Sequence, residues 1–230
     1  MIQGERRLKE RGAESALHQG RTEAARGAAR RRRLTTVALA VGFLSGCGVS
    51  RPIKYFRLTV PSDAAQVEKA DAIPVTLLVG SLMTSHLYRE DRIVYGNGRE
   101  QMGTYEYQRW ADPPTEMIEE VLLRRLRASG SYRAVYYQRS NTQGDFVLRG
   151  HLHDFNELTG SQLSTRVTLE LEMRDLKTGA MVWTHDYTHD EPVDGKDVLA
   201  VVAALDRNVQ RGVSEMVASL YQYFASHGAK

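Results

Sequence analysis

The clearest pattern in the chain is a strict alternation of two kinds of side chain over residues 163–174. One set is Leu163, Thr165, Val167, Leu169, Leu171 and Met173, and polar or charged residues stand between its members. This period of two predicts a strand with one face buried and the other in water. Asp175 to Gly179 then reads as a five-residue hairpin turn. We therefore expect residues 181–187 to return as the partner strand.

Two other stretches keep helical spacing. Apolar residues recur every three or four positions from Val198 to Phe224, which predicts a long helix covering one face of a sheet. A second helix is expected to start at Asp112-Pro113-Pro114-Thr115, because proline is tolerated in the first turn. Ser129-Gly130 marks its end.

Shorter apolar runs predict the remaining strands. They cover residues 55–60, 75–79, 92–95, 104–110, 134–137 and 146–155, with Asn97-Gly98 as a hairpin signal and residues 63–71 as a polar loop. Together these elements predict an α+β fold: an antiparallel-rich mixed sheet packed by two main helices, in a single domain.

A separate apolar run, Val37 to Leu44, lies near the N-terminus. It has about 8 residues, which suits the core of a secretory signal peptide and falls far short of the roughly 20 needed to span a bilayer. Four arginines, Arg30 to Arg33, precede it, and Cys47, which is the only cysteine of the chain, follows it.

The motif Leu44-Ser45-Gly46-Cys47 resembles a bacterial lipobox, at which the cysteine is acylated and the chain is cut just before it. The alternative is a free cysteine near the end of a cleavable signal or a buried helix, which explains neither the arginines nor the spacing. We expect residues 1–46 to be a signal peptide with a basic n-region, 47–54 a lipid-anchored tether and 55–226 the folded domain. No cofactor is expected beyond diacylglycerol and an N-acyl chain on Cys47.

The signal peptide changes the interpretation of the charge. The full chain carries a net charge of +3, but residues 47–230 hold 21 Lys or Arg against 24 Asp or Glu, a net charge of −3. Nucleic-acid binding depends on clustered basic residues, and the mature chain lacks that excess. The sequence therefore predicts no nucleic-acid partner.

Catalytic and metal-binding patterns are weak. His151, His153, His185 and His189, with Asp186 and Asp190, could be drawn as a metal site, but their spacing matches no ligand motif. Glu106 and Asp112 could be paired carboxylates, yet one lies in a predicted strand and the other at a helix start. We expect neither a metal site nor an enzyme.

One block of the chain resembles a known family. Arg92-Ile93-Val94-Tyr95 is followed by Tyr105-Glu106-Tyr107, then by Arg109-Trp110-Ala111-Asp112-Pro113-Pro114, a helix and Ser129-Gly130. Behind a lipobox, this order resembles the ABC-type transport auxiliary lipoproteins of the PqiC and YmbA kind. The Arg109 to Pro114 block is the most specific part of the resemblance, which covers most of residues 53–225.

The resemblance implies a non-enzymatic component of an intermembrane lipid-transport system. Its implied partners are an MCE-domain protein with an ABC permease and ATPase, and its implied place is the periplasmic face of the outer membrane, through the lipid anchor. Tyr105, Tyr107, Arg109 and Trp110 are our candidate contact residues, because amphipathic aromatics and arginine are enriched at protein interfaces. Trp110 has an alternative role, which is to anchor the helix start in the core.

Two other functions are compatible with the sequence. The chain could assist a cell-wall or outer-membrane assembly machine by contact, or its sheet and long helix could enclose an apolar pocket for a lipid tail. The sequence leaves the oligomeric state open, a homo-oligomer included. It also leaves open the lipid and the direction of transport.

Overall fold

The structure is a computed structural model that describes residues 51–61, 71–97 and 100–228. The predicted signal peptide, Cys47, the first residues of the tether and most of the predicted loop 63–71 lie outside the described residues. The prediction that Cys47 carries lipid therefore stays a prediction.

The described residues form an α+β domain with a mixed eight-stranded sheet. Its strands are β1 (Lys54–Phe56), β2 (Ile73–Thr84), β3 (Arg92–Gly96), β4 (Met102–Trp110), β5 (Tyr132–Tyr137), β6 (Phe146–Leu158), β7 (Ser164–Asp175) and β8 (Met181–Pro192). Its helices are α2 (Pro114–Ser129) and α3 (Val198–His227), with short 3-10 turns η2 (His86–Tyr88) and η3 (Gln138–Ser140). The predicted fold class is confirmed.

Strand β6 is the centre of the sheet. Along one edge it pairs antiparallel with the whole of β7, which in turn pairs antiparallel with β8. Its other edge is shared, since β2 runs parallel to its first half and β3 parallel to its end. Strand β5 lies outside β2, and β4 and β1 lie outside β3. The two longest ladders, β6–β7 and β7–β8, are thus antiparallel, while β2–β6, β2–β5, β3–β6 and β1–β4 are parallel.

The predicted alternation of buried and partly exposed side chains in residues 164–173 is confirmed. Every second residue of β7 from Thr165 to Met173 is buried, and the residues between them are only partly covered. The predicted hairpin forms as well, but β8 continues to Pro192, five residues beyond the expected Tyr187.

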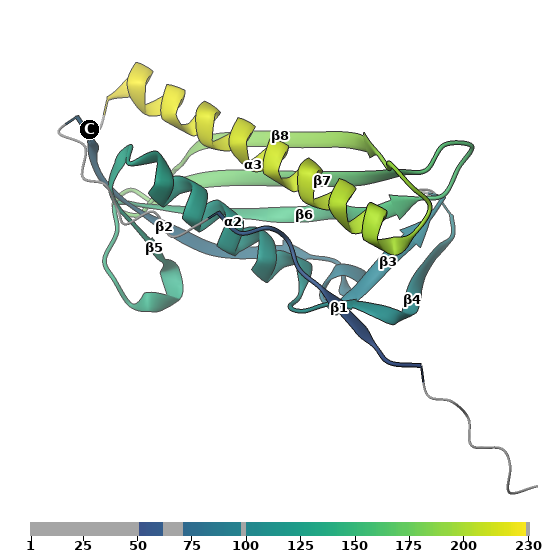
Figure 1. The fold of residues 1–230 in the computed structure, drawn as a ribbon. Helices are drawn as coiled ribbons and strands as arrows, with labels where there is room; N and C mark the ends of the chain where they lie inside the picture. Colours follow the sequence, from purple (N-terminus) through teal and green to yellow (C-terminus); the bar gives the residue numbers. More distant parts are fainter. Residues whose placement is uncertain (1–50, 62–70, 98–99, 229–230) are drawn as a thin grey trace, which may run out of the picture. The chain divides into compact units, whose positions relative to one another are not determined.

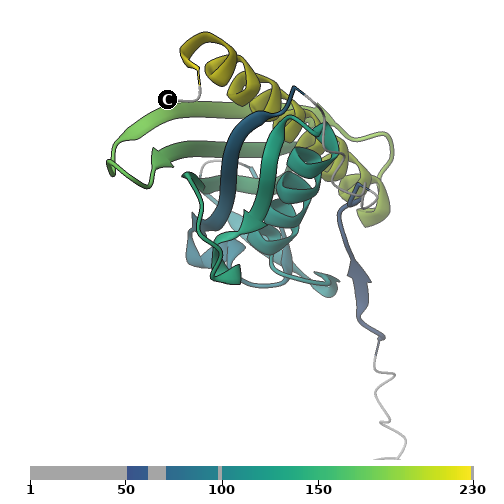
Figure 2. The same ribbon diagram turned by 90° about the vertical axis from the view of Figure 1, so that its left-hand side faces the viewer.

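Both helices lie on the same side of the sheet, as Figures 1 and 2 show. Helix α3 covers β7 and β8, and α2 covers β2 and β5. Helix α2 begins at the predicted prolines and ends at Gly130, whose φ of +59° is the left-handed cap that glycine adopts without strain. The Asp197 side chain accepts a hydrogen bond from the Ala200 N–H at 2.9 Å and caps the start of α3.

The predicted strand 55–60 is wrong in its second half. Only β1 joins the sheet, and the following residues leave it to run against α3. The Thr59 N–H donates to Asp206 Oδ1 at 2.9 Å, and the Thr59 carbonyl accepts from Gln210 at 2.7 Å. Helix side chains therefore replace the ladder partners that the pattern implied, while Leu58 is buried at 1% exposure.

Candidate partner-contact site

The predicted contact residues lie on β4, beside the strand that follows the predicted tether. Strand β1 pairs parallel with β4, so that Tyr55 lies opposite Arg109 and Phe56 opposite Trp110. On its other side β4 pairs antiparallel with β3, with an irregular register between Arg92 and Val94. The sheet thus brings the end of the tether and the candidate residues together at one edge.

Trp110 belongs to the core. Its side chain is 1% exposed, and its ring centroid lies 5.2 Å from that of Phe155 on β6. Its backbone N–H donates to the Asp91 carbonyl at 2.7 Å. Trp110 therefore takes the anchoring role that the sequence offered as the alternative, and its buried indole is not available as a surface contact.

Arg109 is partly exposed and ion-paired. Its Nη1 lies 2.8 Å from Asp91 Oδ1, and the exposed fraction of the Arg109 side chain is 23%. Its Nε has no hydrogen-bond partner among the described residues. The guanidinium is thus held in place by one carboxylate, its Nε is buried, and only part of its surface reaches the solvent.

Tyr105 belongs to a polar contact inside the domain. Its hydroxyl donates to Glu157 Oε2 at 2.6 Å, and Glu157 is only 5% exposed. Tyr95 packs edge-on against the Tyr105 ring at 5.0 Å. Burial and the hydrogen bond to Glu157 raise the pKa of Tyr105, so its hydroxyl stays a donor at neutral pH. Much of this side chain serves the fold.

Tyr107 is the most accessible of the aromatic candidates. Its side chain is half-buried, and hydrogen bonding to Glu106 raises its pKa. Tyr55, opposite Arg109 on β1, is 62% exposed and extends the same edge. Sequence reasoning missed Tyr55 and Asp91 as parts of this site, because only the pairing of the strands places them beside Arg109.

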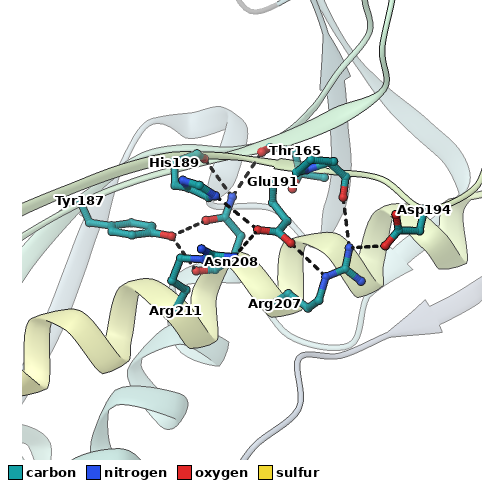
Figure 3. Close-up of polar contacts among 9 residues, drawn as sticks. Thr165, Tyr187, His189, Glu191, Asp194, Arg207, Asn208 and Arg211 are labelled. Atoms are coloured by element: carbon teal, nitrogen blue, oxygen red, sulfur yellow. Dashed lines mark hydrogen bonds and ion pairs between the residues drawn. The ribbon is translucent and has the colours of Figure 1, made fainter.

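A second polar cluster lies between α3 and the open end of the β7–β8 hairpin, where β7 starts and β8 ends (Figure 3). Asn208 is fully buried and donates to the carbonyls of Thr165 and His189, while the Tyr187 hydroxyl donates to its Oδ1 at 2.7 Å. Because each partner is buried or partly buried, this network fixes the position of α3 over the sheet.

Glu191 forms the charged half of this cluster. Its carboxylate is 3.1 Å from Arg207 Nε and 3.0 Å from Arg211 Nη2. Burial alone would raise the pKa of Glu191, but the hydrogen bond from Arg207 and the charges of both arginines hold it below its usual range. The cluster is internally neutralised, which is typical of a structural ion-pair network.

The four strand histidines do not converge. His151 and His153 stack with ring centroids 4.5 Å apart on β6, and His153 faces Glu170. His185 and His189 lie on β8 and contact Glu215 and Glu191 respectively. Within residues 51–61, 71–97 and 100–228, no three His, Cys, Asp or Glu side chains are arranged to hold a metal ion.

Glu106 and Asp112, weighed and set aside above as a carboxylate pair, lie in different surroundings. Glu106 lies on β4, whereas Asp112 lines an open cavity of about 480 Å³ between α2 and the segment that follows β1. A second open cavity, of about 410 Å³, lies on the face of the sheet away from the helices. Charged side chains line both, namely Arg57, Asp112, Glu116, Glu120, Arg124 and Arg139 in the first and Arg149, Glu170 and Glu172 in the second. Charged side chains thus interrupt the lining of both cavities, whereas sites for apolar ligands are lined mainly by apolar and aromatic side chains.

One buried carboxylate has a structural explanation. Glu119 of α2 accepts a hydrogen bond from the Leu82 N–H at 2.8 Å, where the β2–β6 register is irregular. Burial raises its pKa. The helix thus supplies the acceptor that the strand lacks at this point.

None of the helices formed by the described residues is both long and apolar enough to cross a bilayer.

Comparison with solved structures confirms the fold. Protein XCC0632 from Xanthomonas campestris, a member of the family DUF330, superposes with a TM-score of 0.64 at 20% identity, over 75% of this chain and 98% of that one. An uncharacterised protein superposes with a TM-score of 0.59 at 13% identity, over 74% of this chain and 99% of that one. No curated protein matches the chain by sequence.

Comparison with family models identifies the chain itself. The model described as "ABC-type transport auxiliary lipoprotein component" matches residues 56–217, which include β4, α2 and most of α3. The matched region is more than half of the chain and contains the Arg109 to Pro114 block on which the resemblance was based. The chain therefore belongs to the family of ABC-type transport auxiliary lipoprotein components.

Proposed function

We propose that this protein is a lipid-anchored, non-enzymatic component of an MCE/ABC-type intermembrane lipid-transport system. It acts at the outer-membrane end, on the periplasmic face, by contact with the MCE-domain protein. The observation that carries the proposal is the family match over residues 56–217, which follows a lipobox at Leu44 to Cys47.

The contact site that we propose is centred on Tyr107 and Arg109. Tyr107 is partly exposed, and Arg109 presents a guanidinium that is partly exposed and already oriented by Asp91. Ordered arginines and tyrosines of this kind dominate the binding energy of many interfaces. Trp110 contributes indirectly, because its burial fixes the end of β4.

Co-purification tests this site. We expect Tyr107→Ala combined with Arg109→Glu to reduce recovery of the MCE-domain protein from detergent-solubilised envelopes by about 30-fold, the loss for about 2 kcal/mol at an interface hot spot. Because Arg109→Glu alone would place two carboxylates together, the same pair should also be tested with Asp91→Arg, which restores an internal ion pair.

The control is thermal unfolding of each variant. A variant with Asp91→Arg that melts as the wild type does but no longer recovers the partner supports the site. Unchanged recovery of the MCE-domain protein with all three substitutions would contradict it. Genes for an MCE protein and a permease beside this one would distinguish the proposed role from assistance to an assembly machine.

A further inference from the structure

The residues that enter the domain form a basic and partly apolar segment, which we call the basic segment and define as residues 51–57. It contains Arg51, Lys54 and Arg57 and no acidic residue. All of its side chains except that of Phe56 are exposed, including Ile53 at 45% and Tyr55 at 62%. Phe56 packs partly against the core, and residues 54–56 of the segment form β1 at the sheet edge.

The rest of the domain has the opposite charge. Residues 58–230 hold 18 Lys or Arg and 24 Asp or Glu, a net charge of −6. An anionic surface would therefore repel most of the domain and attract the basic segment. The charge distribution alone favours one orientation, with β1 toward such a surface.

Chain length keeps the segment close to the predicted anchor. Ile53 is six residues from Cys47, and six extended residues span at most about 20 Å. A lipid on Cys47 would thus hold Ile53, Lys54 and Tyr55 within reach of the headgroup layer.

The side chains suit that layer. Lysine and arginine next to a membrane attachment point bind anionic headgroups, and tyrosine and an aliphatic side chain favour the boundary between headgroups and acyl chains. We propose that the basic segment lies on an anionic phospholipid surface and holds the β1–β4 edge of the sheet against the membrane. This proposal rests on the lipid anchor of the proposed function.

The geometry has a consequence for the partner. Tyr55 of the basic segment lies opposite Arg109 on the neighbouring strand. The proposed contact site would therefore lie at the membrane surface, where the MCE-domain protein would meet it.

The experiment uses the mature lipoprotein inserted from outside into preformed phosphatidylcholine vesicles, with or without phosphatidylglycerol. Ile53→Cys supplies a single free thiol for a nitroxide label, because Cys47 is acylated. Reduction of the nitroxide by ascorbate in the water reports its exposure. Leu199→Cys on α3, a position that is 63% exposed, provides the control label.

We expect the label at position 53 to be protected only in vesicles with phosphatidylglycerol, and the label at 199 to be exposed in both. Each basic residue near an anionic surface contributes about fivefold to binding, so Lys54→Gln with Arg57→Gln should weaken the protected state by about 25-fold. Arg174→Gln with Lys177→Gln, at the β7–β8 hairpin, makes the same charge change at the opposite end of the sheet (Figure 1) and should have no effect.

Equal reduction rates in the two kinds of vesicle would overturn the proposal. Protection that requires the MCE-domain protein would also overturn it and would assign the basic segment to a protein interface. Failure of the protein to co-float with the vesicles in a density gradient is a different result. It would show that the lipid anchor is missing and would remove the basis of both proposals.

Discussion

Trp110→Ala is expected to lower the free energy of unfolding by about 3–5 kcal/mol, the usual cost of removing a large aromatic side chain from a packed core. The indole is 1% exposed and contacts Phe155 across the sheet, so its loss leaves a cavity at the junction of β4 and β6. Urea denaturation of the purified domain measures this loss. Binding to the partner should fall only as far as the folded fraction falls.

Tyr107→Ala on the same strand is the matched control. Because Tyr107 is partly exposed, we expect its removal to change the free energy of unfolding by less than about 1 kcal/mol while weakening the partner contact. The opposite pattern, in which Trp110→Ala is neutral for stability and abolishes binding, would show that Trp110 is a contact residue after all.

Cys47→Ala is expected to move the protein from the membrane fraction to the soluble fraction. Each buried methylene of an acyl chain contributes about 0.8 kcal/mol to membrane binding, so two or more chains give stable attachment. A protein without acyl chains lacks this binding energy. The basic segment alone is too short to replace the anchor. Fractionation of cell envelopes with immunodetection provides the measurement.

Ser50→Ala is the control for this change, because it alters the tether without affecting the lipobox. It should leave the protein in the membrane fraction. Membrane retention of Cys47→Ala after a high-salt wash would contradict the lipid anchor.

The helices and strands that were predicted best are those whose residue pattern depends only on the element itself. The alternation in β7 follows from one buried face, and the ends of α2 follow from proline at its start and Gly130 at its end. The predictions that failed depended on distant partners. Residues 57–60 look like a strand, yet Asp206 and Gln210 of α3 draw Thr59 away from the sheet.

The same limit applies to the candidate site. The block from Tyr105 to Trp110 identified the right strand. Its sequence pattern does not show which of its side chains are buried, because the pairing of β4 with β3 is irregular. The contact between Trp110 and Phe155 and the ion pair between Arg109 and Asp91 both depend on the β3–β4 and β3–β6 pairing. Parallel pairs such as β3–β6 join segments far apart in the chain and leave no local signal. The buried position of Asn208 on α3 also has no local signal, because its partners lie on β7 and β8, far away in the chain.

The proposed contact between β4 and the MCE-domain protein is tested most directly by site-specific photocrosslinking in intact cells, with a benzophenone amino acid in place of Tyr107. We expect a covalent adduct with the MCE-domain protein, and no such adduct from the same group at Tyr221, which is 50% exposed on α3. Absence of the adduct from position 107 in a protein that is folded and membrane-bound, or equal adducts from both positions, would contradict it.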